Sequence, residues 1–244
     1  MKRLGFFILL FAAALTASAQ IRIATPNTEM VLSAEQGKTL KIQYFGARLS
    51  DADLANLQAA GVPDHNAYQP YGFNCASEPA FAATHCDGNM STVLTVESIS
   101  KAEEPTAEVT RIRLKDTVYP LYVTVCYRAY KDVDMIETWT EIENLEKKPV
   151  TLTRFDSGYL PVRVGDVWLS HLHGTWAAEG RLVQEPLDRG MRVIKNKDGS
   201  RNSHTDHAEV MFSLDGKPQE NSGRVIGAAL CYSGNYELRI DTKD

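Results

Sequence analysis

Apolar and polar residues alternate along most of this 244-residue sequence, and this period of two constrains the fold more than any other feature. Successive side chains of a strand point to opposite faces of a sheet, so the alternation indicates strands with one buried face. These segments are rich in β-branched, Leu and Tyr residues, and most are bounded by turn or charged residues. They cover residues 39–46, 91–100, 107–116, 121–130, 134–144, 150–158, 191–196, 208–214, 224–234 and 236–242.

Many short strands without alternating helices predict an all-β fold, a large twisted β-sandwich, rather than β-α-β units. At 43% hydrophobic residues the chain has ample material for a core. Its length permits one large β domain or two small ones. We predict one domain over residues 20–244.

One short helical insert is expected over residues 50–60. Ser50 followed by Asp53 is a variant of the capping box, and Gly61 is suited to follow the last turn. A long segment with little periodicity follows, from 62 to 89. Segments of this length inside compact domains are usually functional or disordered, and four aromatic residues favour an ordered one: Tyr68, Tyr71, Phe73 and Phe81.

Residues 1–19 have the three parts of a secretory signal peptide: a basic start, an apolar run over 4–15 and an Ala-x-Ala cleavage site at 17–19. Gln20 follows the cleavage site, where a lipid anchor would need a cysteine. No later segment approaches the roughly 18 apolar residues that span a bilayer. We therefore expect a secreted or periplasmic chain with no membrane partner.

Charge excludes one class of partner. Loss of Lys2 and Arg3 with the leader, which contains no acidic residue, moves the formal net charge from −5 to −7. An acidic chain without a basic stripe is a poor match for nucleic acid. We expect no nucleic-acid partner.

Four cysteines occur in the sequence. Cys75 and Cys86 lie in a polar, turn-rich stretch, where an oxidising compartment would allow a disulfide between them, and the sequence leaves this open. Cys126 and Cys231 lie in strand-like segments, which predicts two buried free thiols. No CxxC pair is present, so a zinc ribbon is excluded.

The segment "HLHGTWAAEG" (171–180) carries a tryptophan on a Gly-flanked turn after a strand-like segment. His171 and His173 would point to one side of a strand, and Asp206 with His204 and His207 would complete a metal-ligand set. The absence of a thiolate pair or an HExxH pattern favours plain polar residues, so no metal and no cofactor are expected. Trp176 either closes the end of the sandwich or presents a flat apolar face for stacking on a sugar.

No catalytic pattern is evident. The chain has no GxSxG. Glu141 and Glu143, two residues apart in a strand-like segment, are better explained as a solvated strand face than as a glycosidase pair. We predict no catalytic residue in this chain.

From about residue 40 to the C-terminus, the chain resembles the N-terminal domain of glycoside hydrolase family 36 α-galactosidases. The likeness rests on a W-x-x-H-L-x-G-x-W segment, a later Gly-, Ile-, Ser- and His-containing turn and a closing Y-S-G-N, with weaker similarity in "YFGARL" and "YGFNCASEPAF". The matching residues are Trp168, His171, Leu172, Gly174, Trp176, Gly190, Ile194, Gly199, Ser203, His204, Gly223, Val225, Gly227, Leu230, Tyr232, Ser233, Gly234 and Asn235.

The resemblance implies a supersandwich that precedes a (β/α)₈ barrel in a retaining α-galactosidase, with a tryptophan and an aspartate of the sandwich lining the galactose site. These roles fall on Trp176 and, by order and spacing, on Asp64. A barrel needs about 250 further residues, so we expect both catalytic carboxylates to lie outside this sequence. The implied ligands are α-galactoside oligosaccharides, and the implied full-length enzyme is a homo-oligomer. The alternative is a free-standing carbohydrate-binding or interaction β-sandwich without enzymatic activity.

Overall fold

The computed structural model describes residues 20–59, 65–72, 77–162, 165–200 and 205–243. The chain divides into two compact units, unit 1 from Met1 to Val162 and unit 2 from Arg163 to Asp244. Within the described ranges, strands dominate, every ladder between named strands is antiparallel, and one short helix is present. The predicted all-β, sandwich-like fold with one helical insert is confirmed. The leader over 1–19 lies outside the described residues, and the domain boundaries stay a prediction.

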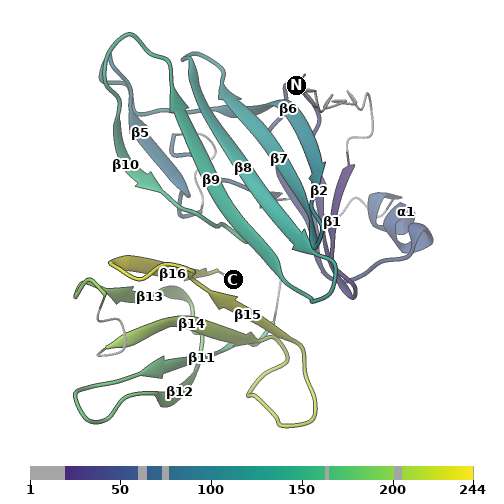
Figure 1. Ribbon diagram of the computed structural model, residues 1–244, viewed down its shortest axis with the longest axis vertical. Coiled ribbons are helices and arrows are strands. Elements are labelled where there is room, and N and C mark those ends of the chain that lie inside the picture. Colours follow the sequence, from purple (N-terminus) through teal and green to yellow (C-terminus); the bar gives the residue numbers. More distant parts are fainter. Residues whose placement is uncertain (1–19, 60–64, 73–76, 163–164, 201–204, 244) are drawn as a thin grey trace, which may run out of the picture. The chain divides into compact units, whose positions relative to one another are not determined.

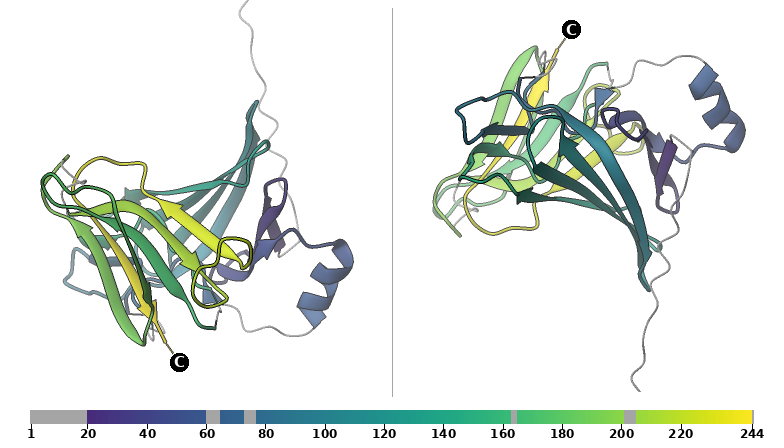
Figure 2. Two further views of the ribbon diagram at one scale, coloured as in Figure 1. Left: turned by 90° about the horizontal axis from the view of Figure 1, so that it is seen from below. Right: turned by 90° about the horizontal axis from the view of Figure 1, so that it is seen from above.

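Unit 1 contains two four-stranded sheets and a two-stranded one (Figure 1). The first sheet has the order β1-β2-β3-β4, the second β6-β7-β8-β9, and β10 pairs with β5. In Figure 2, β6 to β9 form one continuous curved sheet. The strands are β1 (Gln20–Ala24), β2 (Thr28–Ser33), β3 (Lys41–Ala47), β4 (His65–Asn66), β5 (Phe81–Thr84), β6 (Leu94–Glu103), β7 (Ala107–Asp116), β8 (Leu121–Tyr130), β9 (Ile136–Asn144) and β10 (Thr151–Phe155).

One hydrophobic core joins these sheets. Alternate residues of β8, from Leu121 to Ala129, face inward and pack with apolar residues of β1, β2, β5, β6 and β7. The predicted long segment over 62–89 contributes to this core, since Tyr68 and Phe81 are buried. Sequence inspection missed β5 within that segment because its four residues do not alternate; three of them are buried.

The outer face of the β6–β9 sheet is covered by paired charges. Arg113 contacts Glu97 at 2.8 Å and Glu143 at 2.6 Å, so Glu143, one of the two acids weighed as a glycosidase pair, belongs to an ion-pair lattice. Trp139 lies in the same layer, with the guanidinium of Arg128 5.1 Å from its ring centre. The outer face is therefore a partly exposed surface of paired charges.

Unit 2 is smaller and has two sheets. β12-β11-β14-β15 is one, and β13 pairs with β16. Its buried core consists of Leu169, Ile194 and Val210, with five partly buried apolar side chains packed against them. The strands are β11 (Trp168–His173), β12 (Arg181–Pro186), β13 (Gly190–Asn196), β14 (Asp206–Ser213), β15 (Val225–Ala229) and β16 (Tyr236–Thr242).

The helix α1 (Asp51–Ala59) begins where the capping box predicts. The backbone N–H of Asp53 donates to Ser50 Oγ at 3.1 Å, and the Ser50 hydroxyl donates to Asp53 Oδ2 at 2.6 Å. Both views of Figure 2 show α1 beside the first sheet of unit 1, not packed on its face. Only Leu54 and Leu57 among its described side chains are half-buried. The helix is therefore held mainly at its N-terminus.

Candidate functional site

Trp176 lies at the tip of a tight turn that follows β11, and its side chain is 84% exposed. The turn closes through two backbone hydrogen bonds between Thr175 and Ala178, of 3.0 and 3.3 Å. Ala177, the residue after the tryptophan, has a φ of 60°, in the left-handed region that favours glycine. A positive φ only at the third residue is the pattern of a type II turn. Trp176 therefore does not close the sandwich, and its ring is held out from unit 2.

Two histidines at the end of β11 converge on one carboxylate below this turn. His173 Nδ1 lies 3.1 Å from Asp206 Oδ1, and His171 Nδ1 lies 3.7 Å from the same oxygen. A bulge between β11 and β14 falls between the two histidines and brings Asp206 opposite His173. The Asp206 carbonyl accepts a hydrogen bond of 2.6 Å from the Tyr236 hydroxyl. The histidines thus belong to the strand, and the turn begins after them.

The buried member of this group is His171, whose side chain is 3% exposed. Neither ring nitrogen has a hydrogen-bond partner, and Glu185 Oε1 lies 3.8 Å from Nε2 on the far side of the ring. Arg192 pairs with that same oxygen at 2.8 Å. Burial lowers the pKa of the His171 imidazole below its ordinary value. The ring is therefore neutral at neutral pH.

The metal-ligand set considered from the sequence is assembled only in part. In the part of the chain that the structure describes, no group of three or more His, Cys, Asp or Glu side chains is arranged to hold a metal ion. His207 lies by Glu209 instead, 3.8 Å away, and His204 lies outside the described residues. The hydrogen bond between His173 and Asp206 has the geometry of a brace, and the His171 ring faces the same carboxylate without a hydrogen bond.

Gly234 and Asn235 of the Y-S-G-N segment have a structural role, together with Asn196 and Gly199. The buried Asn196 side chain donates to the carbonyls of Gly199 and Gly234, at 2.6 and 2.8 Å. Gly199 N–H in turn donates to Asn235 Oδ1 at 2.9 Å. A Cβ on Gly234 would lie 2.5 Å from the Tyr232 ring, so a larger residue there would require this exposed ring to move. These residues join the turn after β13 to the start of β16.

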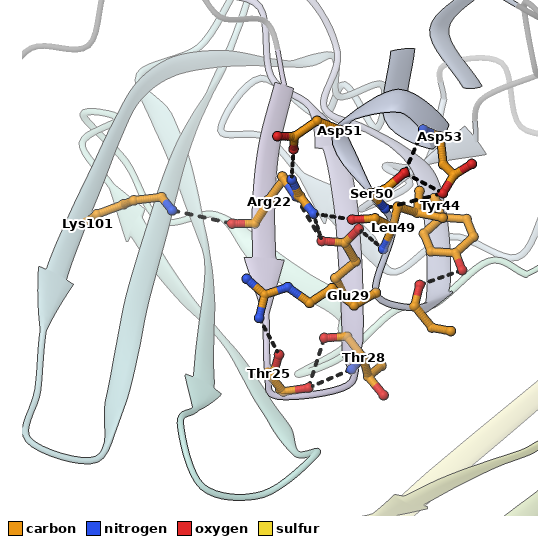
Figure 3. Close-up of polar contacts among 12 residues, drawn as sticks. Arg22, Thr25, Thr28, Glu29, Tyr44, Leu49, Ser50, Asp51, Asp53 and Lys101 are labelled. Atoms are coloured by element: carbon orange, nitrogen blue, oxygen red, sulfur yellow. Dashed lines mark hydrogen bonds and ion pairs between the residues drawn. The ribbon is translucent and has the colours of Figure 1, made fainter. Parts of the chain in front are cut away.

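Asp64, the second predicted sugar-site residue, lies outside the described residues, but the start of the segment that leads to it is well defined (Figure 3). The fully buried Glu29 of β2 accepts hydrogen bonds from Arg22 Nε at 2.9 Å and from Leu49 N–H at 2.7 Å. Arg22 Nη1 also donates to Asp51 at 2.9 Å. The Glu29 hydrogen bond raises the pKa of Arg22. Glu29 and Arg22 thus form a clamp that fixes the start of α1 on the first sheet.

The cysteine predictions have mixed outcomes. Cys126 is a buried free thiol, as predicted, but it faces the charged outer layer, with Glu141 Oε1 3.8 Å from its sulfur. Cys231 is exposed, and the prediction that it is buried in a strand is wrong because β15 ends at Ala229. Cys86 is an exposed free thiol, and Cys75 lies outside the described residues.

Comparison with known proteins agrees with this architecture. The sequence profile of the glycosyl hydrolase family 36 N-terminal domain matches residues 38–244. The chain is thus a domain of the glycoside hydrolase class. Within that class it belongs to family 36, as an N-terminal domain.

Curated relatives are α-galactosidases. α-Galactosidase AgaA of Geobacillus stearothermophilus is 28% identical over 138 residues, which are 57% of this chain and 19% of that protein. α-Galactosidase Mel36A of Lactobacillus acidophilus is 27% identical over 139 residues, again 57% of this chain and 19% of the relative. The matched segment thus spans about a fifth of each relative.

Solved structures share the fold over most of the chain. The crystal structure of AgaA superposes with a TM-score of 0.78 and 22% identity, covering 91% of this chain and 35% of that one. The galactosidase domain of AgaSK gives a TM-score of 0.82 at 20% identity, covering 92% and 36%. Variants of AgaA have been crystallised with raffinose and with stachyose.

Proposed function

We propose that this chain is the N-terminal β-sandwich of an exported α-galactosidase that removes terminal α-galactosyl groups with retention. The relatives of this domain carry that activity in their names, and AgaA variants have been crystallised with the α-galactosides raffinose and stachyose. A retaining mechanism needs two carboxyl groups about 5 Å apart, which we assign to a catalytic domain outside this sequence. The contribution of this chain is one wall of the sugar site.

The exposed Trp176 carries this proposal. An indole ring presented to solvent on a braced, strained turn loses little freedom when a sugar stacks on it. Backbone strain of the kind seen at Ala177 is often kept at ligand-contacting positions. Asp64 is the proposed second contact, from the segment that follows α1. Homo-oligomer formation through the full-length enzyme is part of the same proposal.

The decisive measurement is the kinetics of the full-length enzyme with p-nitrophenyl α-galactoside. Trp176→Ala should lower kcat/KM by a factor that corresponds to a loss of roughly 1–3 kcal/mol of transition-state stabilisation, because the sugar contact is lost. Its stability should change by less than the roughly 3–5 kcal/mol expected for truncating a core tryptophan. Trp139→Ala is the matched control, because that ring contacts Arg111 and Arg128 in the outer layer of unit 1 and should affect stability alone.

A Trp176→Ala enzyme that unfolds, with unchanged kinetics in the surviving fraction, would contradict the assignment. A full-length product without any catalytic domain would instead favour a free-standing carbohydrate-binding or interaction sandwich.

Export is the second part of the proposal. Removal of residues 1–19 would leave β1 whole, because that strand begins at Gln20. No helix among the described residues has the length and apolar character to cross a bilayer. N-terminal sequencing of the protein recovered from the medium or periplasm should begin at Gln20, and an unprocessed Met1 would argue against a cleaved leader.

A further inference from the structure

We propose that Asp206 is a positioning residue for Trp176: its carboxylate holds the end of β11 through His173 and so fixes the turn that presents the indole ring. The inference rests on the proposed function only in calling that ring a sugar contact. The bracing itself follows from contacts inside unit 2.

Two contacts connect Asp206 and its neighbour with the base of the turn. His173, the last residue of β11, pairs with the Asp206 carboxylate at 3.1 Å. Directly beside this pair, Gly174 N–H donates to the carbonyl of Thr205 at 2.6 Å. Both residues that enter the turn are therefore held by Asp206, the first residue of β14, and by the residue before it.

Asp206 is itself held in place. The Tyr236 hydroxyl of β16 donates to its backbone carbonyl, and burial raises the pKa of this tyrosine to about 12, so it remains a donor at neutral pH. The side chain of Asp206 is 27% exposed and also faces the buried His171 ring, at 3.7 Å. Asp206, in β14, therefore contacts β11 through its carboxylate and β16 through its backbone carbonyl.

The turn needs such a brace. The positive φ of Ala177 is strained relative to ordinary helical or extended backbone. Two Thr175–Ala178 backbone hydrogen bonds close the turn, and Trp176 is too exposed to add packing. Contacts at the base of the turn therefore contribute to its order.

Amide hydrogen exchange of the full chain tests the brace without any sugar. In Asp206→Ala, exchange at Gly174 and Ala178 should accelerate about tenfold, while the β7–β8 amides stay unchanged. Asp206→Asn keeps an oxygen that can accept from His173 and should restore most of the protection. Asp215→Ala is the matched control, since it removes another ion-paired carboxylate of unit 2, bound to Arg224 at 2.6 Å.

A second variant covers the case in which Asp206→Ala unfolds unit 2. His173→Ala changes a side chain that is 46% exposed and should loosen the same two amides without affecting the core. Unchanged exchange at Gly174 and Ala178 in His173→Ala, or equal acceleration in Asp215→Ala, would overturn the proposal.

The sugar contact is tested separately, by the change in the 5-fluorotryptophan resonances of the full-length enzyme when raffinose is added. Trp139 and Trp168 are the internal references. If the ring contacts sugar, raffinose should shift the Trp176 resonance in the parent protein, and more weakly in Asp206→Ala. Loosened amides without any raffinose response at Trp176 would support the brace and contradict the proposed function. A full response in both proteins, together with loosened amides, would show that the brace does not serve binding.

Discussion

Ala177 and His171 each adopt an arrangement that reduces the stability of the fold. Ala177 lies in the Trp176 turn, and His171 lies in β11 just before that turn. Ala177 adopts a backbone conformation that usually belongs to glycine, and His171 is buried with two unpartnered ring nitrogens. Neither property is readable from the sequence, because an alanine carries no signal for positive φ. The proximity of His171 to Asp206 depends on pairing between strands 35 positions apart in the chain. The flanking glycines of Trp176 indicated a turn but left open whether its ring is exposed.

Replacing Ala177 by glycine should stabilise unit 2. Glycine adopts a φ of 60° without the Cβ penalty but has a more disordered unfolded state, so the net gain should be about 0.5–1 kcal/mol. Urea unfolding followed through 5-fluorotryptophan at Trp168 measures it. Ala178→Gly, at a position without positive φ, should destabilise by a similar amount; stabilisation by both variants would exclude relief of strain as the cause.

Stability of unit 2 should fall as the pH is lowered from about 6.5, the ordinary pKa of histidine. Because burial lowers the pKa of His171 in the folded state, the unfolded chain binds its proton more readily, and the contribution present at higher pH is lost on acidification. Urea unfolding at pH 7.5 and 5.0 should show this loss, and His171→Gln should reduce it. Substitution of the exposed His65 in unit 1 should not reduce this loss of stability. An unchanged pH dependence in His171→Gln would contradict the assignment.

At the scale of elements, regular alternation predicted the strands with one buried face, whereas strands buried on both faces could not be predicted from it. The segments 107–116 and 121–130 coincide with β7 and β8, whose two faces differ in polarity. β2 was missed because its four central residues are all buried. The apolar segment 224–234 predicts one strand, but β15 covers only its first half and ends at Ala229, which is why the prediction for Cys231 is wrong. The capping box located α1 because its signal is local.

The clamp at the start of α1 should be dominated by its buried half. Glu29→Ala leaves Arg22 without its buried partner and should destabilise unit 1 by about 3 kcal/mol. Asp51→Ala removes an ion pair whose acid is 97% exposed and should cost no more than about 1 kcal/mol. Urea unfolding of each variant, followed through Trp139, measures both. Equal costs would show that burial does not determine the strength of the clamp.

At the scale of the whole molecule, the alternation pattern predicted the fold class and the motifs indicated the family. The division into two compact units was not predicted. Length permitted one or two domains, and strand patterns carry no information on which cores are separate. The boundary lies near residue 162, shortly before β11 begins at Trp168. Each unit has its own core, and that of unit 2 is much the smaller among the described residues.

The isolated chain should show no α-galactosidase activity. Its family match covers an N-terminal domain, and the acid pair considered from the sequence, Glu141 and Glu143, lies in the charged outer layer of unit 1. Release of p-nitrophenol from the α-galactoside by purified mature chain should stay at background. Turnover that survives repurification and disappears on mutation of an acid in this chain would overturn the assignment of both carboxylates to another domain.

The position of Cys126 beneath the charged outer layer bears on the reactivity of this free thiol. Burial, reinforced by the Glu141 carboxylate and opposed by the charge of Arg111, raises the pKa of this thiol to about 12. The thiolate is the nucleophile that attacks oxidants and disulfides, so a raised pKa makes the side chain a poor nucleophile at neutral pH. Burial beside a carboxylate thus favours an unreactive Cys126.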